Sequence, residues 1–263
     1  MINWFTNLPY SIQALIATCF TWFITSLGAA VVFLFKRVNK TTLDAMLSLS
    51  AGVMLAATFF SLLLPAMEMA DNLEMISWVV VSIGFLLGGL LLFFGDKIFN
   101  KMTKNKNITR KKRSWMLIFS ITLHNIPEGM AIGVAFGSVF YNLDGATLMA
   151  AVLLAIGIGI QNFPEGVAVS LPLRREGMSP KKAFIFGVLS GIVEPISAVI
   201  GAILVLKVKI LLPILLAFAG GAMIYVVVQE LIPESQKNKR KDLMSLFTIL
   251  GFIIMMIFDI TLG

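Results

Sequence analysis

The feature that most constrains this chain is a short polar motif that occurs twice inside long apolar runs. Residues 123–129 read Leu-His-Asn-Ile-Pro-Glu-Gly, and residues 160–166 read Ile-Gln-Asn-Phe-Pro-Glu-Gly. A charged side chain at the centre of a bilayer costs about 2.5 to 3.5 kcal/mol even on a permissive insertion scale. Two glutamates in one repeated motif therefore indicate a function that stabilises or uses their charge.

The composition supports a membrane location for these runs. Hydrophobic residues make up 58% of the 263 residues and charged residues 13%, whereas soluble domains carry about 25% charged residues. The chain is therefore predicted to be an all-α polytopic membrane protein. Its single cysteine, Cys19, excludes an internal disulfide.

Eight apolar runs are long enough to span a bilayer, which takes roughly 20 residues as a helix. We expect one transmembrane domain over residues 1–263, with a cytoplasmic loop at about 96–114. The expected helices are at about 11–35, 43–66, 76–95, 115–139, 146–173, 181–206, 210–232 and 243–262.

The basic residues indicate the orientation. On this eight-helix plan, 19 of the 21 Lys and Arg residues lie on one face, and Lys207 and Lys209 lie on the other. The positive-inside rule makes the basic face cytoplasmic. Both termini are therefore expected on the outer side of the cell (inner) membrane. The net charge of +7 is therefore a signal of topology, and no nucleic-acid partner is expected.

The repeated motif also suggests internal symmetry. Consecutive spans alternate in direction, so the two copies run antiparallel. A weaker match relates 43–66 to 210–232, where Gly52 and Pro65, like Gly220 and Pro233, are 13 residues apart. Inverted repeats with broken helices are a recurrent plan of secondary transporters. Glycine-rich apolar helices also resemble one another by composition alone, which leaves the second match open.

On a helix, His124 and Glu128 share one face, with Asn125 beside them. Gln161, Asn162 and Glu165 repeat this arrangement. Each motif also contains a proline, which cannot donate to the carbonyl four residues earlier. We therefore expect broken backbone and a freed carbonyl oxygen beside the polar side chains.

A third intramembrane carboxylate, Glu194, precedes Pro195 on the sixth predicted helix. Three carboxylates in one site repel one another unless they are protonated or paired. No Lys or Arg lies near them on the fourth to sixth helices. One or two divalent cations supply the missing charge most economically, and nitrogen and oxygen ligands suit Zn²⁺ and other first-row ions.

Other interpretations of single residues stay open. A histidine in an apolar helix is often a packing residue, and an intramembrane glutamate is often a proton relay. Met54 fits either a soft metal ligand or a core position. Ser61 and Glu230 are candidates for a polar path to the site, with Glu230 also suited to the membrane interface.

The paired Asn-x-Pro-Glu-Gly motifs, together with Glu194, resemble the signature helices of the ZIP (ZRT/IRT-like) metal transporters, bacterial branch. The resemblance covers essentially the whole chain. It implies a homodimer and an elevator-like movement of the metal-carrying helices. It also implies a binuclear site: one metal held by His124, Glu128, Gln161 and Glu165 with Met54 nearby, the other by Asn125, Asn162 and Glu194, with Glu128 and Glu165 bridging.

Two positions depart from the family pattern. Many members have His where this chain has Gln161, and some have Asp where it has Asn162. A carboxamide in place of an imidazole weakens the preference for metals that favour nitrogen, so strict selectivity for Zn²⁺ is not expected. The loop after the third helix contains no histidine, which disfavours a metal-sensing role for it.

We therefore expect a transporter, not an enzyme, that moves Zn²⁺ into the cytoplasm by alternating access. Cd²⁺, Fe²⁺ and Mn²⁺ are further candidate substrates, and no cofactor is expected. One alternative is a membrane-embedded metallohydrolase, which the single histidine and the absence of an H-E-x-x-H helix disfavour. Another is a proton-coupled carrier of an organic solute, with the glutamates as relays.

Overall fold

The computed structural model describes residues 2–34, 39–102, 109–142, 146–208 and 210–262. Within those ranges the regular structure is entirely helical. The first half of the chain forms α1 (Ile2–Thr6), α2 (Tyr10–Ala30), η1 (Val31–Leu34), α3 (Lys40–Ala57), η2 (Thr58–Leu63), α4 (Leu64–Asn72), α5 (Ser77–Met102) and α6 (Thr109–Phe140). The second half forms α7 (Leu148–Arg175), α8 (Pro180–Gly191), α9 (Val193–Ile203), α10 (Val205–Val208), α11 (Leu212–Val226), η3 (Val227–Leu231), α12 (Ile232–Ser235) and α13 (Lys241–Leu262).

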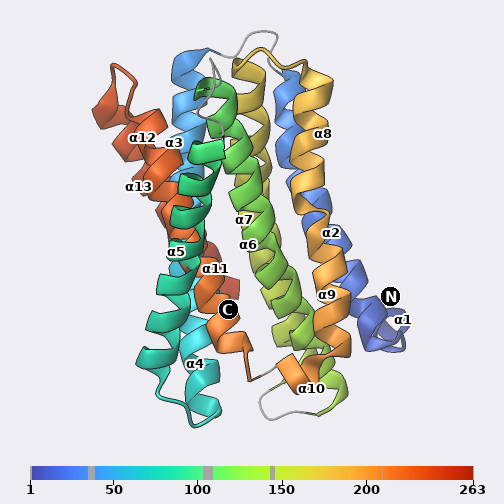
Figure 1. Ribbon diagram of the computed structural model, residues 1–263. Helices are drawn as coiled ribbons and strands as arrows, with labels where there is room; N and C mark the ends of the chain where they lie inside the picture. Colours follow the sequence, from blue (N-terminus) through green and yellow to red (C-terminus); the bar gives the residue numbers. More distant parts are fainter. Residues whose placement is uncertain (1, 35–38, 103–108, 143–145, 209, 263) are drawn as a thin grey trace.

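The long helices form an elongated bundle in which consecutive helices alternate in direction (Figure 1). α6 runs downward in this view and α7 runs upward, so the two polar motifs are antiparallel as predicted. The start of α2 and the end of α13 both lie in the lower half of the view.

Within the described residues, seven helical stretches are long and apolar enough to cross a membrane. They are Tyr10–Leu34, Lys40–Asn72, Ser77–Ile98, Leu148–Arg175, Pro180–Ile203, Leu212–Ser235 and Lys241–Thr261. This agrees with the prediction of a helical, multi-pass membrane protein. The one predicted span outside this set, at about 115–139, falls in α6, which is 32 residues long.

Several helices extend beyond the predicted apolar runs. α5 continues to Met102 and α6 begins at Thr109, so most of the expected loop at 96–114 is helical; residues 103–108 lie outside the description. Hydropathy detects the part of a helix that suits lipid, whereas backbone hydrogen bonds also continue the helix into water. The loop prediction was therefore too wide at both ends.

Close helix contacts made by glycine bring the motif-bearing helices together. A Cβ on Gly129 would collide with Ser197 and the Glu194 backbone, and one on Gly133 would collide with the carbonyl of Ala198. α6 therefore packs against α9 at backbone distance, as small residues allow between membrane helices. Gly166 packs in the same way against the Thr25 carbonyl and fixes α7 to α2.

The backbone at the two motifs differs from the expectation. α6 continues through Pro127 and α7 through Pro164, so neither helix is broken there, although each proline still lacks a donor for the preceding turn. The interruption lies instead between α8 and α9, at Ile192. Pro195 cannot donate to the carbonyl of Gly191, which accounts for the break beside Glu194.

A second irregularity occurs in the helices that contain the weaker repeat. Thr58–Leu63 and Val227–Leu231 are both π-helical, and each is followed by a proline, Pro65 and Pro233. Such π segments inside α-helices are rare and are frequent at functional sites. Their matching positions add a structural likeness to the Gly and Pro spacing that relates the two helices.

Candidate metal site

Six of the predicted ligands are buried on three neighbouring helices. α6 carries Asn125 and Glu128, α7 carries Gln161, Asn162 and Glu165, and α9 carries Glu194. None of these side chains exposes more than 1% of its surface. The backbone of His124 belongs to α6, but its side chain lies outside the described part of the structure.

α6 and α7 are joined by a hydrogen bond between the two motifs. Gln161 Nε2 donates to Glu128 Oε1 at 2.5 Å. The donor is the residue at which the family resemblance suggested histidine, so the carboxamide uses its nitrogen to hold a predicted ligand. Hydrogen bonds to charged groups are stronger than those between neutral groups, and this one orients the Glu128 carboxylate.

Glu194 is held from two further helices. Asn162 Nδ2 lies 2.9 Å from both carboxylate oxygens of Glu194. Thr21 on α2 donates its hydroxyl to Glu194 Oε2 at 2.5 Å. The structure thus adds Thr21, which sequence reasoning missed. The sequence pattern that could have indicated Thr21 is a row of threonines at 18, 21 and 25 on one face of an apolar helix. All three threonines are buried.

The three carboxamides share one unusual property. The amide nitrogens of Asn125, Gln161 and Asn162 all donate hydrogen bonds. The Asn125 nitrogen donates to the Ser190 carbonyl at 3.2 Å. Their side-chain oxygens are buried and find no hydrogen-bond donor in the described part of the chain. A buried acceptor left unsatisfied costs about 1–3 kcal/mol. Bound cations would satisfy these oxygens.

Carboxylates and carboxamides meet at this site through the bonds from Gln161 to Glu128 and from Asn162 to Glu194. Within the described residues, no group of three or more His, Cys, Asp or Glu side chains is arranged to hold a metal ion. The donor set that the structure brings together therefore combines carboxylate and carboxamide oxygens. Oxygen-rich sites suit harder divalent ions as well as Zn²⁺, so these residues fit a divalent cation as transported substrate.

The three secondary candidates lie elsewhere in the fold. Met54 is fully buried in the main apolar core, which also contains Ala131 of α6 and Ala168 of α7. Ser61 lies in the π segment η2 and donates to Asp259 Oδ1 of α13 at 2.7 Å. Glu230 lies in η3 and is partly exposed. Asp259 was missed, although an acidic residue in the last apolar run was a visible signal.

Comparison with known proteins decides the family. A family model described as "ZIP Zinc transporter" matches residues 103–259, a range that contains both polar motifs and Glu194. The chain belongs to the ZIP zinc transporter family. The family resemblance seen in the two motifs is thereby confirmed.

The relatives of this ZIP chain share most of its length. It is 38% identical to zinc transporter ZIP11 of Homo sapiens, over 95% of the chain and 97% of the relative. Zinc transporter ZIPB of Bordetella bronchiseptica is 36% identical over 91% of the chain and 78% of the relative. Zinc transporter GufA of Myxococcus xanthus is 32% identical over 95% and 98%. All three names are those of transporters, as predicted, and none is that of an enzyme.

Proposed function

We propose that this protein carries Zn²⁺ across a cell membrane into the cytoplasm through the buried site between α6, α7 and α9. Cd²⁺, Fe²⁺ and Mn²⁺ are further candidate substrates. The relatives named above as zinc transporters support the substrate class. The protein acts as a carrier, with the metal as its substrate and no resident cofactor.

The observation that carries this proposal is the composition of the buried site. Glu128, Glu165 and Glu194 supply three carboxylates, and three carboxamide oxygens lack a donor among the described residues. The sequence has no Lys or Arg between residues 114 and 173 or between residues 183 and 206, the stretches that carry these groups. Negative charge and unsatisfied acceptors in an apolar bundle both favour a cation over an organic solute.

We propose two metal positions within this site. His124, Glu128, Gln161 and Glu165 form one, with Met54 nearby. Asn125, Asn162 and Glu194 form the other, and Glu128 and Glu165 bridge the two. The hydrogen bonds between Gln161 and Glu128 and between Asn162 and Glu194 support this pairing, because each joins two ligands assigned to the same metal.

The membrane arrangement follows from the charge pattern. We infer a single transmembrane domain of eight helices, including α6, built on inverted repeats, in the inner membrane with both termini outside. The antiparallel motifs and the matching π segments support the repeats. An inside-negative potential of 100 mV supplies about 2.3 kcal/mol per charge, hence about 4.6 kcal/mol for a 2+ ion, so inward movement can proceed without a coupled ion.

Alternating access requires one part of the bundle to move against another. Buried residues of α2, α6, α7 and α9 form one apolar cluster, and buried residues of α3 and α13 form a separate one. The elevator-like mechanism, in which α2, α6, α7, α8 and α9 carry the metal against the other helices, rests on the family resemblance. The main apolar cluster joins α3 to α6 and α7, so such a movement would have to repack these contacts. The homodimer that would provide a fixed scaffold rests on the family resemblance.

Uptake by proteoliposomes tests the function directly. Purified protein is reconstituted, and uptake of Zn²⁺, Cd²⁺, Fe²⁺ and Mn²⁺ is measured with and without a pH gradient. We expect saturable uptake of Zn²⁺ that Glu128→Ala and Glu165→Ala each abolish. Wild-type uptake in either variant would overturn the assignment. Proton flux without any divalent metal would instead favour the proton-coupled carrier.

A further inference from the structure

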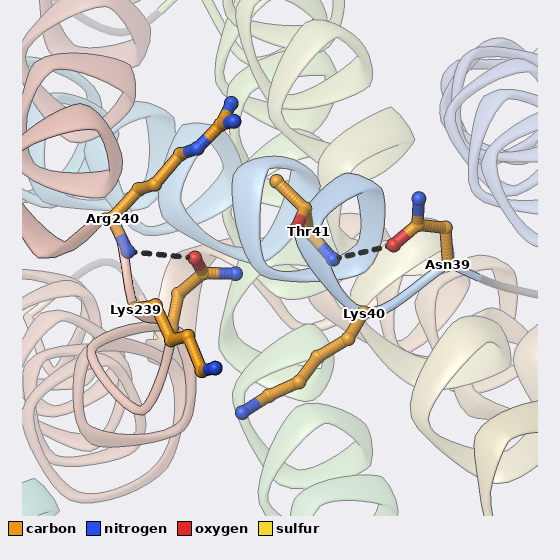
Figure 2. A pocket seen from close by; sticks show the side chains of 6 residues that line it. Asn39, Lys40, Thr41, Lys239 and Arg240 are labelled. Atoms are coloured by element: carbon orange, nitrogen blue, oxygen red, sulfur yellow. Dashed lines mark hydrogen bonds between the residues drawn. The ribbon is translucent and has the colours of Figure 1, made fainter.

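A polar pocket lies away from the metal site, between the start of α3 and the turn that precedes α13. It has a volume of about 450 Å³, and Figure 2 shows it from close by. Its lining residues are Asn39, Lys40, Thr41, Asn238, Lys239 and Arg240. Three of the six are cations, and none is acidic.

Within the described part of the chain, Lys40, Lys239 and Arg240 form no ion pair. Figure 2 shows the ammonium groups of Lys40 and Lys239 turned toward one another. Like charges in this arrangement repel, and an anion bound between them would turn that repulsion into attraction.

The geometry of the pocket is fixed by polar contacts behind it. Asn238 is 4% exposed; its Nδ2 donates to Asp44 Oδ2 at 2.7 Å, and its Oδ1 accepts from the Arg240 backbone at 2.9 Å. Lys40 Nζ donates to the Lys237 carbonyl at 2.9 Å. These bonds tie the turn to α3 and hold the Lys40 ammonium, so the backbone that carries the cations is fixed before a ligand arrives, which lowers the entropic cost of binding.

The nearest buried carboxylate does not cancel this charge. Asp44 is fully buried, and its Oδ1 lies 3.8 Å from Arg175 Nη1. Arg175 lies between Asp44 and Glu234, which it also contacts at 2.6 Å, and Asn238 donates to the other Asp44 oxygen. The three lining cations therefore stay available to an external anion.

The position of the pocket indicates what that anion is attached to. Two of the stretches suited to span a membrane, Lys40–Asn72 and Lys241–Thr261, begin at its rim. Beyond the rim, α13 exposes an apolar row at helical spacing: Leu246, Ile249, Leu250 and Ile253. A phosphate in the pocket would thus lie at the level of lipid headgroups, with an apolar surface running from it into the bilayer.

We propose that this pocket binds the phosphate of an anionic glycerophospholipid on the cytoplasmic side of the membrane. Lys40, Lys239 and Arg240 attract the headgroup, as basic clusters beside spanning helices do. The exposed row on α13 accommodates an acyl chain. The proposal concerns a site separate from the metal ligands and does not depend on which ion is transported.

Lipid titration of the purified protein tests the proposal. The detergent-solubilised protein is titrated with short-chain phosphatidylglycerol, short-chain phosphatidylcholine and inorganic phosphate, and thermal stabilisation and retained lipid are measured. The test variant is K239Q/R240Q, which keeps the Lys40 bond to the Lys237 carbonyl. The matched control, K181Q/K182Q, removes two exposed charges at the start of α8.

We expect phosphatidylglycerol to stabilise the wild type and the control more than phosphatidylcholine does. In K239Q/R240Q, affinity for phosphatidylglycerol should fall roughly 30-fold, as expected for two lost surface cations. An equal fall in K181Q/K182Q would overturn the proposal. Inorganic phosphate as effective as phosphatidylglycerol would overturn the lipid assignment, and equal binding of phosphatidylcholine would overturn the role of charge.

Discussion

Gln161 on α7 donates its side-chain amide to the Glu128 carboxylate on α6, with 2.5 Å between the two atoms. The bond orients one predicted metal ligand by means of another. It also leaves the Gln161 oxygen buried without a donor among the described residues. One carboxamide can therefore position a carboxylate and offer an oxygen to a metal at the same time.

Replacing this carboxamide by an imidazole should change metal preference. In Gln161→His, a nitrogen ligand replaces an oxygen ligand, and nitrogen favours Zn²⁺ over Mn²⁺. We expect the ratio of Zn²⁺ to Mn²⁺ uptake to rise on the order of ten-fold, a scale typical of changes around a metal. Competition assays in proteoliposomes measure it. Gln236→His, on the polar turn before α13, is the control; an unchanged ratio in Gln161→His would contradict the assigned role.

The hydroxyl of Thr21 should matter for Glu194. Thr21→Val removes the hydrogen bond to Glu194 Oε2 while it preserves side-chain shape. A hydrogen bond to a charged group is worth about 1.5–3 kcal/mol, so we expect metal affinity to change by about ten-fold or more, measured by titration of the purified protein.

Thr18→Val provides a matched control on the same helix. Thr18 is equally buried, but its hydroxyl donates only within α2, to the Ala14 carbonyl at 2.7 Å in the shorter of two contacts. This variant should bind metal like the wild type. Equal effects of the two substitutions would mean that Thr21 acts only through packing.

The close contact of α6 and α9 predicts a strong effect of added volume. In Gly133→Ala, the new methyl group would collide with the Ala198 carbonyl. Overpacking typically costs about 1–3 kcal/mol, and here it should also displace Glu194 from Asn162. We expect lower thermal stability and lower uptake.

Gly157 on α7 tests whether the loss of stability in Gly133→Ala comes from the close helix contact or from replacing a glycine as such. A Cβ there would meet nothing within 4 Å. Gly157→Ala should leave stability unchanged or raise it by up to about 1 kcal/mol, because alanine favours the helix. Thermal unfolding of both variants in the same detergent makes the comparison. A destabilised Gly157→Ala with an unaffected Gly133→Ala would contradict the packing described.

Asp44 should contribute to stability far from the metal. It is fully buried and is bonded to Asn238, with Arg175 at 3.8 Å. Asp44→Ala leaves the buried Asn238 amide without its acceptor, which costs about 1–3 kcal/mol, so this variant should unfold at a clearly lower temperature or denaturant concentration. Asp71→Ala, at an exposed position on α4, should stay within about 0.5 kcal/mol of the wild type. Similar stabilities of the two variants would contradict this role.

Much of the fold was predictable because its main signals are local. Apolar run length predicted most helices within a few residues, and the sequence of consecutive spans predicted their alternating direction. The extent of α5 and α6 was not predictable from hydropathy, since their ends continue beyond the apolar stretch. Broken backbone was expected at Pro127 and Pro164, but the helix break lies at Ile192. A proline removes one hydrogen bond without necessarily ending a helix, so the sequence did not show which proline marks the break.

The polar helix faces were predictable from the sequence, but the contacts between them were not. The spacing of Asn125, Glu128, Asn162 and Glu165 predicted which helix faces are polar. Which partner each side chain meets depends on how the helices cross, and that is determined by glycines such as Gly129 and Gly166. The bond between Thr21 and Glu194 joins residues far apart in the sequence, so no local pattern contains it.

The central claim is that the buried carboxylates hold the transported ion. It is tested most directly by measuring Zn²⁺ binding and Zn²⁺ uptake in one preparation of Glu165→Gln, with the exposed Glu68→Gln as control. We expect Glu165→Gln to remain folded, to bind Zn²⁺ at least ten-fold more weakly, a loss on the scale reported for perturbed metal sites, and to show no uptake, while Glu68→Gln matches the wild type. Normal binding and uptake in folded Glu165→Gln would contradict the account.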